Sequence, residues 1–220
     1  MAQSELTVGN TIAAIIFIGA LYWWSLRRQK DREKHLKQLA ERRGLKFETV
    51  KTGFRMFSHN NQSQVTGQLD GRKVAIRTYF TGAGRYTTAW HVMSVSPKTP
   101  SHLAFLIERE DLETQLSRGF GSKRIMTGDK KFDPLWSIQT NQTEFMLAAL
   151  GPDFRARFCQ LCDGGKTAGK FELAGSDVSY TEDDKFVGGV MGTERVEPIF
   201  ELVRDLAAVA EVFAQLPPKL

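Results

Sequence analysis

A long segment near the start of the chain has no charged residue. Residues 6–26 read LTVGNTIAAIIFIGALYWWSL and contain no Asp, Glu, Lys or Arg. At about 1.5 Å of rise per residue, a helix of this length spans about 31 Å, which matches the roughly 30 Å hydrocarbon core of a bilayer. The pattern therefore predicts a transmembrane helix over residues 6–26, after a short N-terminal tail of residues 1–5.

The C-terminal end of this run has the residues of a membrane boundary. Aromatic side chains come first and cations follow, namely Tyr22, Trp23, Trp24, Arg27 and Arg28. Amphipathic rings at the interface and cations beyond it are typical of a transmembrane helix. A cleaved signal peptide would have its basic residues before the apolar run and small residues after it. The order here is the reverse, so we expect these five residues to lie at the membrane interface.

Residues 27–43 predict a basic juxtamembrane helix. They carry eight Lys or Arg against three Asp or Glu, a net charge of +5. Leu36, Leu39 and Ala40 follow the spacing of one helix face, and Gly44 is a natural C-terminal stop.

The basic segment also predicts orientation, because the tail before the apolar run has no Lys or Arg. The positive-inside bias places the N-terminus outside and residues 27–220 in the cytoplasm. These cations could also bind anionic headgroups, at about 1 kcal/mol each. That alternative role stays open beside the topological one.

Beyond Gly44 the apolar positions follow the period of strands. Residues 65–69 and 73–80 flank Asp70-Gly71, which is the strongest short signal for a hairpin. A second hairpin is expected around Gly175-Ser176. The other expected strands cover residues 87–95, 103–107 (as a central strand) and 136–140.

Helical patterns lie between and after these strands, over residues 144–150, from residue 151 to about 163, and over residues 197–216. Clusters of antiparallel strands with intervening helices predict an α+β fold. The expected organisation is therefore a soluble α+β domain over residues 44–216 and a C-terminal tail of residues 217–220.

The charge of this domain argues against one class of partner. Although the chain has a net charge of +5, residues 44–220 carry 22 Lys or Arg against 21 Asp or Glu. Proteins that bind nucleic acids need an excess of cations to displace counterions from phosphates. We therefore expect membrane lipid and other membrane proteins as partners, and no nucleic acid.

Residues 128–158, GDKKFDPLWSIQTNQTEFMLAALGPDFRARF, give a resemblance to a family. Together with LAERRGLKFE and DGRKV, they resemble bacterial single-span membrane-anchored α+β proteins, in which Gly-Asp, Phe-Asp, a strand and a helix follow in this order. The resemblance implies a domain tethered to the bacterial inner membrane, and it brings no catalytic motif.

Cys159 and Cys162 form a Cys-x-x-Cys pair. A structural zinc site needs four ligands, and the sequence has no second pair to complete one. A redox dithiol usually opens a helix, whereas this pair ends one. We expect buried, reduced cysteines, with no metal and no cofactor.

Asp129 and Asp133 lie in the run Gly-Asp-Lys-Lys-Phe-Asp-Pro. They are candidates for paired carboxylates, but Asp is also a common turn and cap residue. We expect a structural role, and therefore no catalytic residue. The leading hypothesis is a membrane-anchored, non-enzymatic interaction or accessory module, as a subunit of a larger membrane complex. The alternative is a membrane-tethered enzyme that uses Asp129 and Asp133 or the Cys159/Cys162 dithiol.

Overall fold

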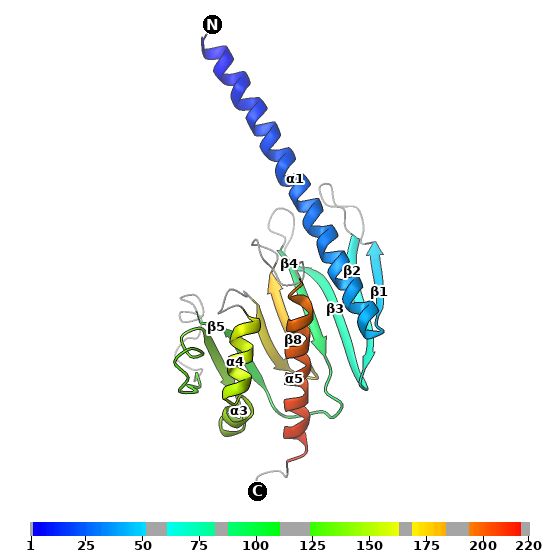
Figure 1. The fold of residues 1–220 in the computed structure, drawn as a ribbon, viewed down its shortest axis with the longest axis vertical. Coiled ribbons are helices and arrows are strands. Elements are labelled where there is room, and N and C mark those ends of the chain that lie inside the picture. Colours follow the sequence, from blue (N-terminus) through cyan, green and yellow to red (C-terminus); the bar gives the residue numbers. More distant parts are fainter. Residues whose placement is uncertain are drawn as a thin grey trace.

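In the computed structural model, an eight-stranded sheet carries helices on one of its faces (Figure 1). The structure describes residues 2–51, 61–81, 88–110, 124–162, 169–183 and 194–216. All paired strands among them are antiparallel. The α+β prediction is therefore confirmed.

The strands follow the order β1-β2-β3-β4-β8-β7-β5-β6 across the sheet. Their bounds are β1 Lys46–Lys51, β2 Asn61–Leu69, β3 Arg72–Thr81, β4 Thr88–Val95, β5 Phe105–Arg109, β6 Trp136–Thr140, β7 Lys170–Ala174 and β8 Asp177–Asp183. The last two strands lie between β4 and β5, so the C-terminal hairpin joins the two halves of the sheet.

Both predicted hairpins are confirmed. Asp70 and Gly71 have φ angles of 52° and 77°, the left-handed conformation that a two-residue hairpin turn of this type requires. β7 and β8 are also joined by two residues, Gly175-Ser176, of which only Gly175 has a positive φ, at 77°. The predicted strand 103–107 begins two residues later, as β5, and it has a partner on each side as a central strand should.

The described helices are α1 Ala2–Arg43, α3 Thr143–Ala149, α4 Pro152–Leu161 and α5 Val196–Ala214. α1 runs without a break over both predicted N-terminal segments, and residues 2–5 of the expected tail are helical. It ends at Arg43, and the φ of 64° at the following Gly44 allows the backbone N–H of Leu45 to donate to the carbonyl of Ala40 at 2.8 Å. The expected tail of residues 217–220 lies outside the described residues.

In the part of the chain that the structure describes, no helix combines the length and the apolar character that crossing a membrane requires. The transmembrane helix over residues 6–26 is therefore not confirmed and stays a prediction.

The core lies between the sheet and the helix layer. The last turns of α1 pack on β1 and β2, and α5 packs on β4 and β8. A series of buried aromatic rings connects α4 to the middle of the sheet, with neighbouring centroids 4.9 to 5.8 Å apart, and its members are Phe132, Trp136, Phe158, Phe171 and Tyr180. None of the described helices covers the other face of the sheet (Figure 1).

Candidate functional site

The projecting part of α1 exposes large apolar side chains. Ile16, Phe17 and Ile18 are 66%, 63% and 65% exposed, and Figure 1 shows this part of the helix extending well past the sheet. Because consecutive residues of a helix point to different sides, these three exposed apolar side chains are spread around α1 and are not confined to one face.

The predicted interface residues follow on the same helix. Tyr22, Trp23 and Trp24 are 53%, 61% and 39% exposed. The Arg27 guanidinium lies 5.5 Å from the centre of the Trp23 ring, within the range of a cation–π contact. The side chain of Arg28 lies outside the described residues. The three rings and the cation therefore lie within two turns of α1, as expected of a membrane interface.

Asp133 holds the loop that precedes β6. Its carboxylate accepts hydrogen bonds from the N–H and hydroxyl of Thr127, at 3.1 and 2.9 Å, and from the N–H of Gly128 at 2.9 Å. Arg124 donates to the Asp133 carbonyl and pairs with Glu110 at 3.4 Å. Backbone and side-chain donors therefore take the place of water around this buried carboxylate, as a buried charge requires.

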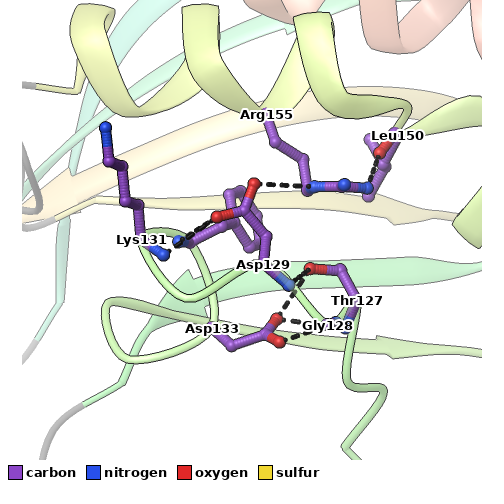
Figure 2. A network of polar contacts seen from close by, with 8 residues as sticks. Thr127, Gly128, Asp129, Lys131, Asp133, Leu150 and Arg155 are labelled. Atoms are coloured by element: carbon purple, nitrogen blue, oxygen red, sulfur yellow. Dashed lines mark hydrogen bonds and ion pairs between the residues drawn. The ribbon is translucent and has the colours of Figure 1, made fainter.

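Asp129 faces a different set of donors, as Figure 2 shows. One carboxylate oxygen accepts from the N–H groups of Lys131 and Phe132 at 2.9 and 3.2 Å, and the other lies 3.3 Å from Arg155 Nε. The hydrogen bond from Lys131 and the contact with Arg155 hold the pKa of Asp129 below its ordinary value. Because Arg155 is on α4, its contact with Asp129 ties the loop to this helix, and the same guanidinium donates to the carbonyl of Leu150 at 2.5 Å.

Asp129 and Asp133 therefore lie in the same loop but bind different groups. Each carboxylate is engaged by its own donors, the one of Asp133 by Thr127 and Gly128, and the one of Asp129 by Lys131, Phe132 and Arg155. Within the described residues, no group of three or more His, Cys, Asp or Glu is placed to hold a metal ion. The hydrogen bonds show that both carboxylates hold the loop together, and the expectation that neither is catalytic stays a prediction.

Cys159 and Cys162 lie at the C-terminal end of α4, and neither forms a disulfide. Cys162 is fully buried, and burial raises the pKa of its thiol. Burial, followed by the nearby charge of Asp129, raises the pKa of the half-buried Cys159 as well. Because the thiolate is the nucleophile, both shifts disfavour dithiol chemistry.

A buried polar cluster that the sequence analysis did not predict lies on the helix-covered face of the sheet. The ring of His91 shares a hydrogen bond of 2.8 Å with the hydroxyl of Thr78, and Tyr180 donates to the carboxylate of Glu182 at 2.9 Å. His91 and Glu182 are directly opposite each other on β4 and β8. Burial and the adjacent Glu182 charge raise the pKa of Tyr180 well above its usual value.

A glycine makes room for this cluster, because a Cβ on Gly169 would overlap the Tyr180 ring. One signal in the sequence could have indicated it. The alternation of residues 87–95 places His91 on the same face as Met93 and Val95, which are core residues.

A shallow groove of about 350 Å³ lies between α3 and α5. Its lining is mostly apolar and consists of Phe145, Ala148, Ala149, Ala208, Val209 and Val212, with Asp205 as the charged residue of that lining. Val212 is 54% exposed.

Comparison with known proteins gives no family. No family model matches the chain, and no curated protein sequence matches it. Among solved structures, the chain is similar to the crystal structure of the mycobacterial trehalose monomycolate transport factor A, TtfA, at 13% sequence identity and a TM-score of 0.48. The match covers 86% of this chain and 98% of that one.

Proposed function

We propose that this protein is a membrane-anchored, non-enzymatic interaction module that serves as an accessory subunit of a larger membrane complex. α1 is its single transmembrane span, with the N-terminus outside. The sheet and its helices are on the cytoplasmic side of the bacterial inner membrane.

The observation that carries the proposal is the exposure of apolar side chains on the projecting part of α1. Ile16, Phe17 and Ile18 lie in the middle of an uncharged run of 21 residues. Placing such a run in water leaves its apolar area hydrated, at roughly 25 cal/mol per Å². A bilayer removes this cost, and Trp23 and Arg27 are the residues that suit its boundary.

The domain end of the same helix is firmly attached. Leu36, Leu39 and Ala40 are at most 2% exposed. Arg43 pairs with Glu197 at 3.0 Å and with Glu201 at 2.7 Å on α5. Because this end of α1 is fixed to the domain, the domain is held in a defined position relative to the membrane that α1 crosses.

The interaction role is supported by the chemistry of the folded part. Asp129, Asp133, Cys159 and Cys162 are used for structure, and the apolar groove between α3 and α5 offers a surface for a partner helix. A groove of this kind suits the apolar face of an amphipathic helix.

Membrane extraction tests the anchor. Full-length protein is expected to stay with the membrane in alkaline carbonate and to leave it only in detergent. Protease added outside intact cells should leave the domain uncut, and protease added to inverted vesicles should digest it. Release by carbonate, or digestion from outside, would contradict the proposed topology.

Co-purification after mild detergent extraction tests the accessory role. The full-length chain should elute with a membrane partner, and Val212→Asp should reduce that association without changing the melting temperature of the domain. Lys130→Asp, an exposed change on the loop after Gly128, is the matched control. A solitary monomer in every detergent, or equal association for both variants, would count against this role.

A further inference from the structure

The geometry points to a second membrane contact: we propose that the end of the sheet nearest the projecting part of α1 lies against the bilayer surface, with Tyr79 and Trp90 among the lipid headgroups. This inference rests on the proposed anchor and specifies how the domain sits on the membrane.

The first step is the distance between the bilayer and the sheet. After α1 ends at Arg43, only Gly44 and Leu45 precede β1, which turns back along the helix and contacts it. Figure 1 shows β1 pointing toward the side from which α1 projects. Six residues of β1 return about 20 Å, at about 3.3 Å each.

The same 20 Å corresponds to about 13 residues of α1, at about 1.5 Å each. The end of β1 is therefore about level with Lys30. Arg27 lies three residues further along the helix, which adds only about 5 Å. If the cations mark the boundary, this end of the sheet is within about 10 Å of it.

The strand pairing brings the aromatic side chains to this end. β3 ends at Thr81 and β4 begins at Thr88, and Tyr79 is paired with Trp90 just inside these ends. Both rings lie on the face of the sheet away from the helices. Their centroids are 6.5 Å apart and their planes differ by 16°.

The two rings have the character of interface residues. Tyr79 is 42% exposed, and Trp90 keeps its ring N–H satisfied by donating to the hydroxyl of Thr81 at 2.8 Å. Tyr and Trp favour the headgroup region because each has an apolar body and a polar tip.

At the opposite end of β3 and β4, the side chains on this face of the sheet are of a different kind. There the matching positions on β3 and β4 are Lys73, Ala75 and Ser94. An aromatic pair that served only to stabilise strand pairing would suit either end. Large rings at the end near α1, and small or charged side chains at the far end, indicate a lipid surface as the occupant.

The experiment measures the distance of labelled positions from the headgroups. Full-length protein, with Cys159→Ser to remove the half-buried thiol, is labelled with a fluorophore at Thr88→Cys, Lys73→Cys or Lys30→Cys. Each sample is reconstituted in phosphatidylcholine vesicles that contain some phosphatidylglycerol, with and without lipids that carry a nitroxide quencher on the headgroup.

Thr88 and Lys73 lie on the same face of the sheet, and the register places them at opposite ends, about eight residues or 27 Å apart. We expect quenching at Thr88→Cys to approach that at Lys30→Cys and to exceed that at Lys73→Cys severalfold. Replacing both rings, with Tyr79→Thr and Trp90→Thr, should lower quenching at Thr88→Cys severalfold while the far-UV circular dichroism stays unchanged.

The possible quenching results distinguish the anchor, the position of the sheet end and the contact of the two rings. If Lys30→Cys is quenched and Thr88→Cys is quenched no more than Lys73→Cys, the anchor stands and the second contact is overturned. If Lys30→Cys is not quenched, the anchor itself is wrong. If removal of the rings leaves the quenching unchanged, the sheet end is near the membrane without the contact proposed for Tyr79 and Trp90.

Discussion

One helix of this protein has two halves with opposite surroundings. Near its C-terminus, Leu36 and Leu39 are 2% and 1% exposed because β1, β2 and α5 cover them. Near its middle, Ile16 and Ile18 are 66% and 65% exposed. Among the side chains of α1 that the structure describes, Leu36 and Leu39 pack against protein, whereas Ile16 and Ile18 do not.

The charge pattern follows the same division. The C-terminal half is amphipathic, with cations on its outer side and ion pairs from Arg42 and Arg43 to α5. The exposed half has no charged residue from position 6 to 26. A helix that is apolar on one stripe packs on a domain, whereas one that is apolar on all sides suits a membrane. Changes in the two halves should therefore have separable effects.

The largest effect is expected from charges in the exposed half. Ile16→Lys combined with Ile18→Lys should cost about 6 kcal/mol of membrane insertion, since a Lys at the centre of a transmembrane helix costs about 3 kcal/mol. The protein should shift from the membrane to the soluble fraction, while the melting temperature of the domain is unchanged. Ile16→Leu with Ile18→Leu is the control, and it should remain with the membrane.

The next effect concerns the packed half. Leu39→Ala removes a side chain that is 1% exposed and should destabilise the domain by about 2–5 kcal/mol, as measured by urea unfolding in detergent. Membrane association should persist at low temperature. Phe17→Ala, at a position 63% exposed, should leave the unfolding midpoint unchanged. Equal loss of stability in both variants would remove the distinction between the halves.

A smaller effect is expected within the domain from Asp133→Asn. The amide has a single acceptor oxygen, so at least one of the three donors from Thr127 and Gly128 loses its partner. The free energy of unfolding should fall by about 1–3 kcal/mol. Lys130→Gln, at an exposed position of the same loop, should change it little. Unchanged stability for Asp133→Asn would contradict the structural role given to this carboxylate.

The smallest effect concerns the ion pairs that join α1 to α5. Burial alone would raise the pKa of Glu197, but the hydrogen bonds from Arg42 and Arg43 outweigh it and lower the pKa below its usual 4.5. A carboxylate with a lowered folded-state pKa contributes stability that is present above pH 4.5 and is lost as the pH falls through the folded-state value.

Glu197→Gln should therefore reduce stability at neutral pH by about 1 kcal/mol or less, because the pair is partly exposed. The difference from the parent protein should disappear in acid. Melting temperatures of both proteins between neutral and acidic pH check this, and a difference that grows as the pH falls would contradict it.

Local signals in the sequence explain which elements were predicted. The Asp70-Gly71 turn requires only its own two residues and the alternation beside them, and its hairpin is confirmed. β1 was not predicted, because the two apolar residues of its sequence KFETVK, Phe47 and Val50, fall on opposite faces and give no alternating pattern. Its place in the sheet depends on its pairing with β2, which no pattern within residues 46–51 indicates.

The polar clusters depend on longer distances in the chain. Asp133 accepts hydrogen bonds from residues five and six positions away, and its structural role follows from turn chemistry. His91 and Glu182 come together only through the pairing of β4 with β8. Residues that far apart in sequence share no spacing rule, so the sequence could indicate His91 as a core residue but could not indicate its neighbour.

The most direct test of the account is a cysteine-accessibility scan along α1 in native membranes. Single cysteines from residue 6 to 43 are treated with a membrane-impermeant maleimide. We predict continuous protection over residues 6–26, and then a helical alternation in which Leu36→Cys, Leu39→Cys and Ala40→Cys are protected while Lys37→Cys and Gln38→Cys react. Reaction on one or more faces throughout residues 6–26 would show that water surrounds this half as well, and would contradict the membrane anchor.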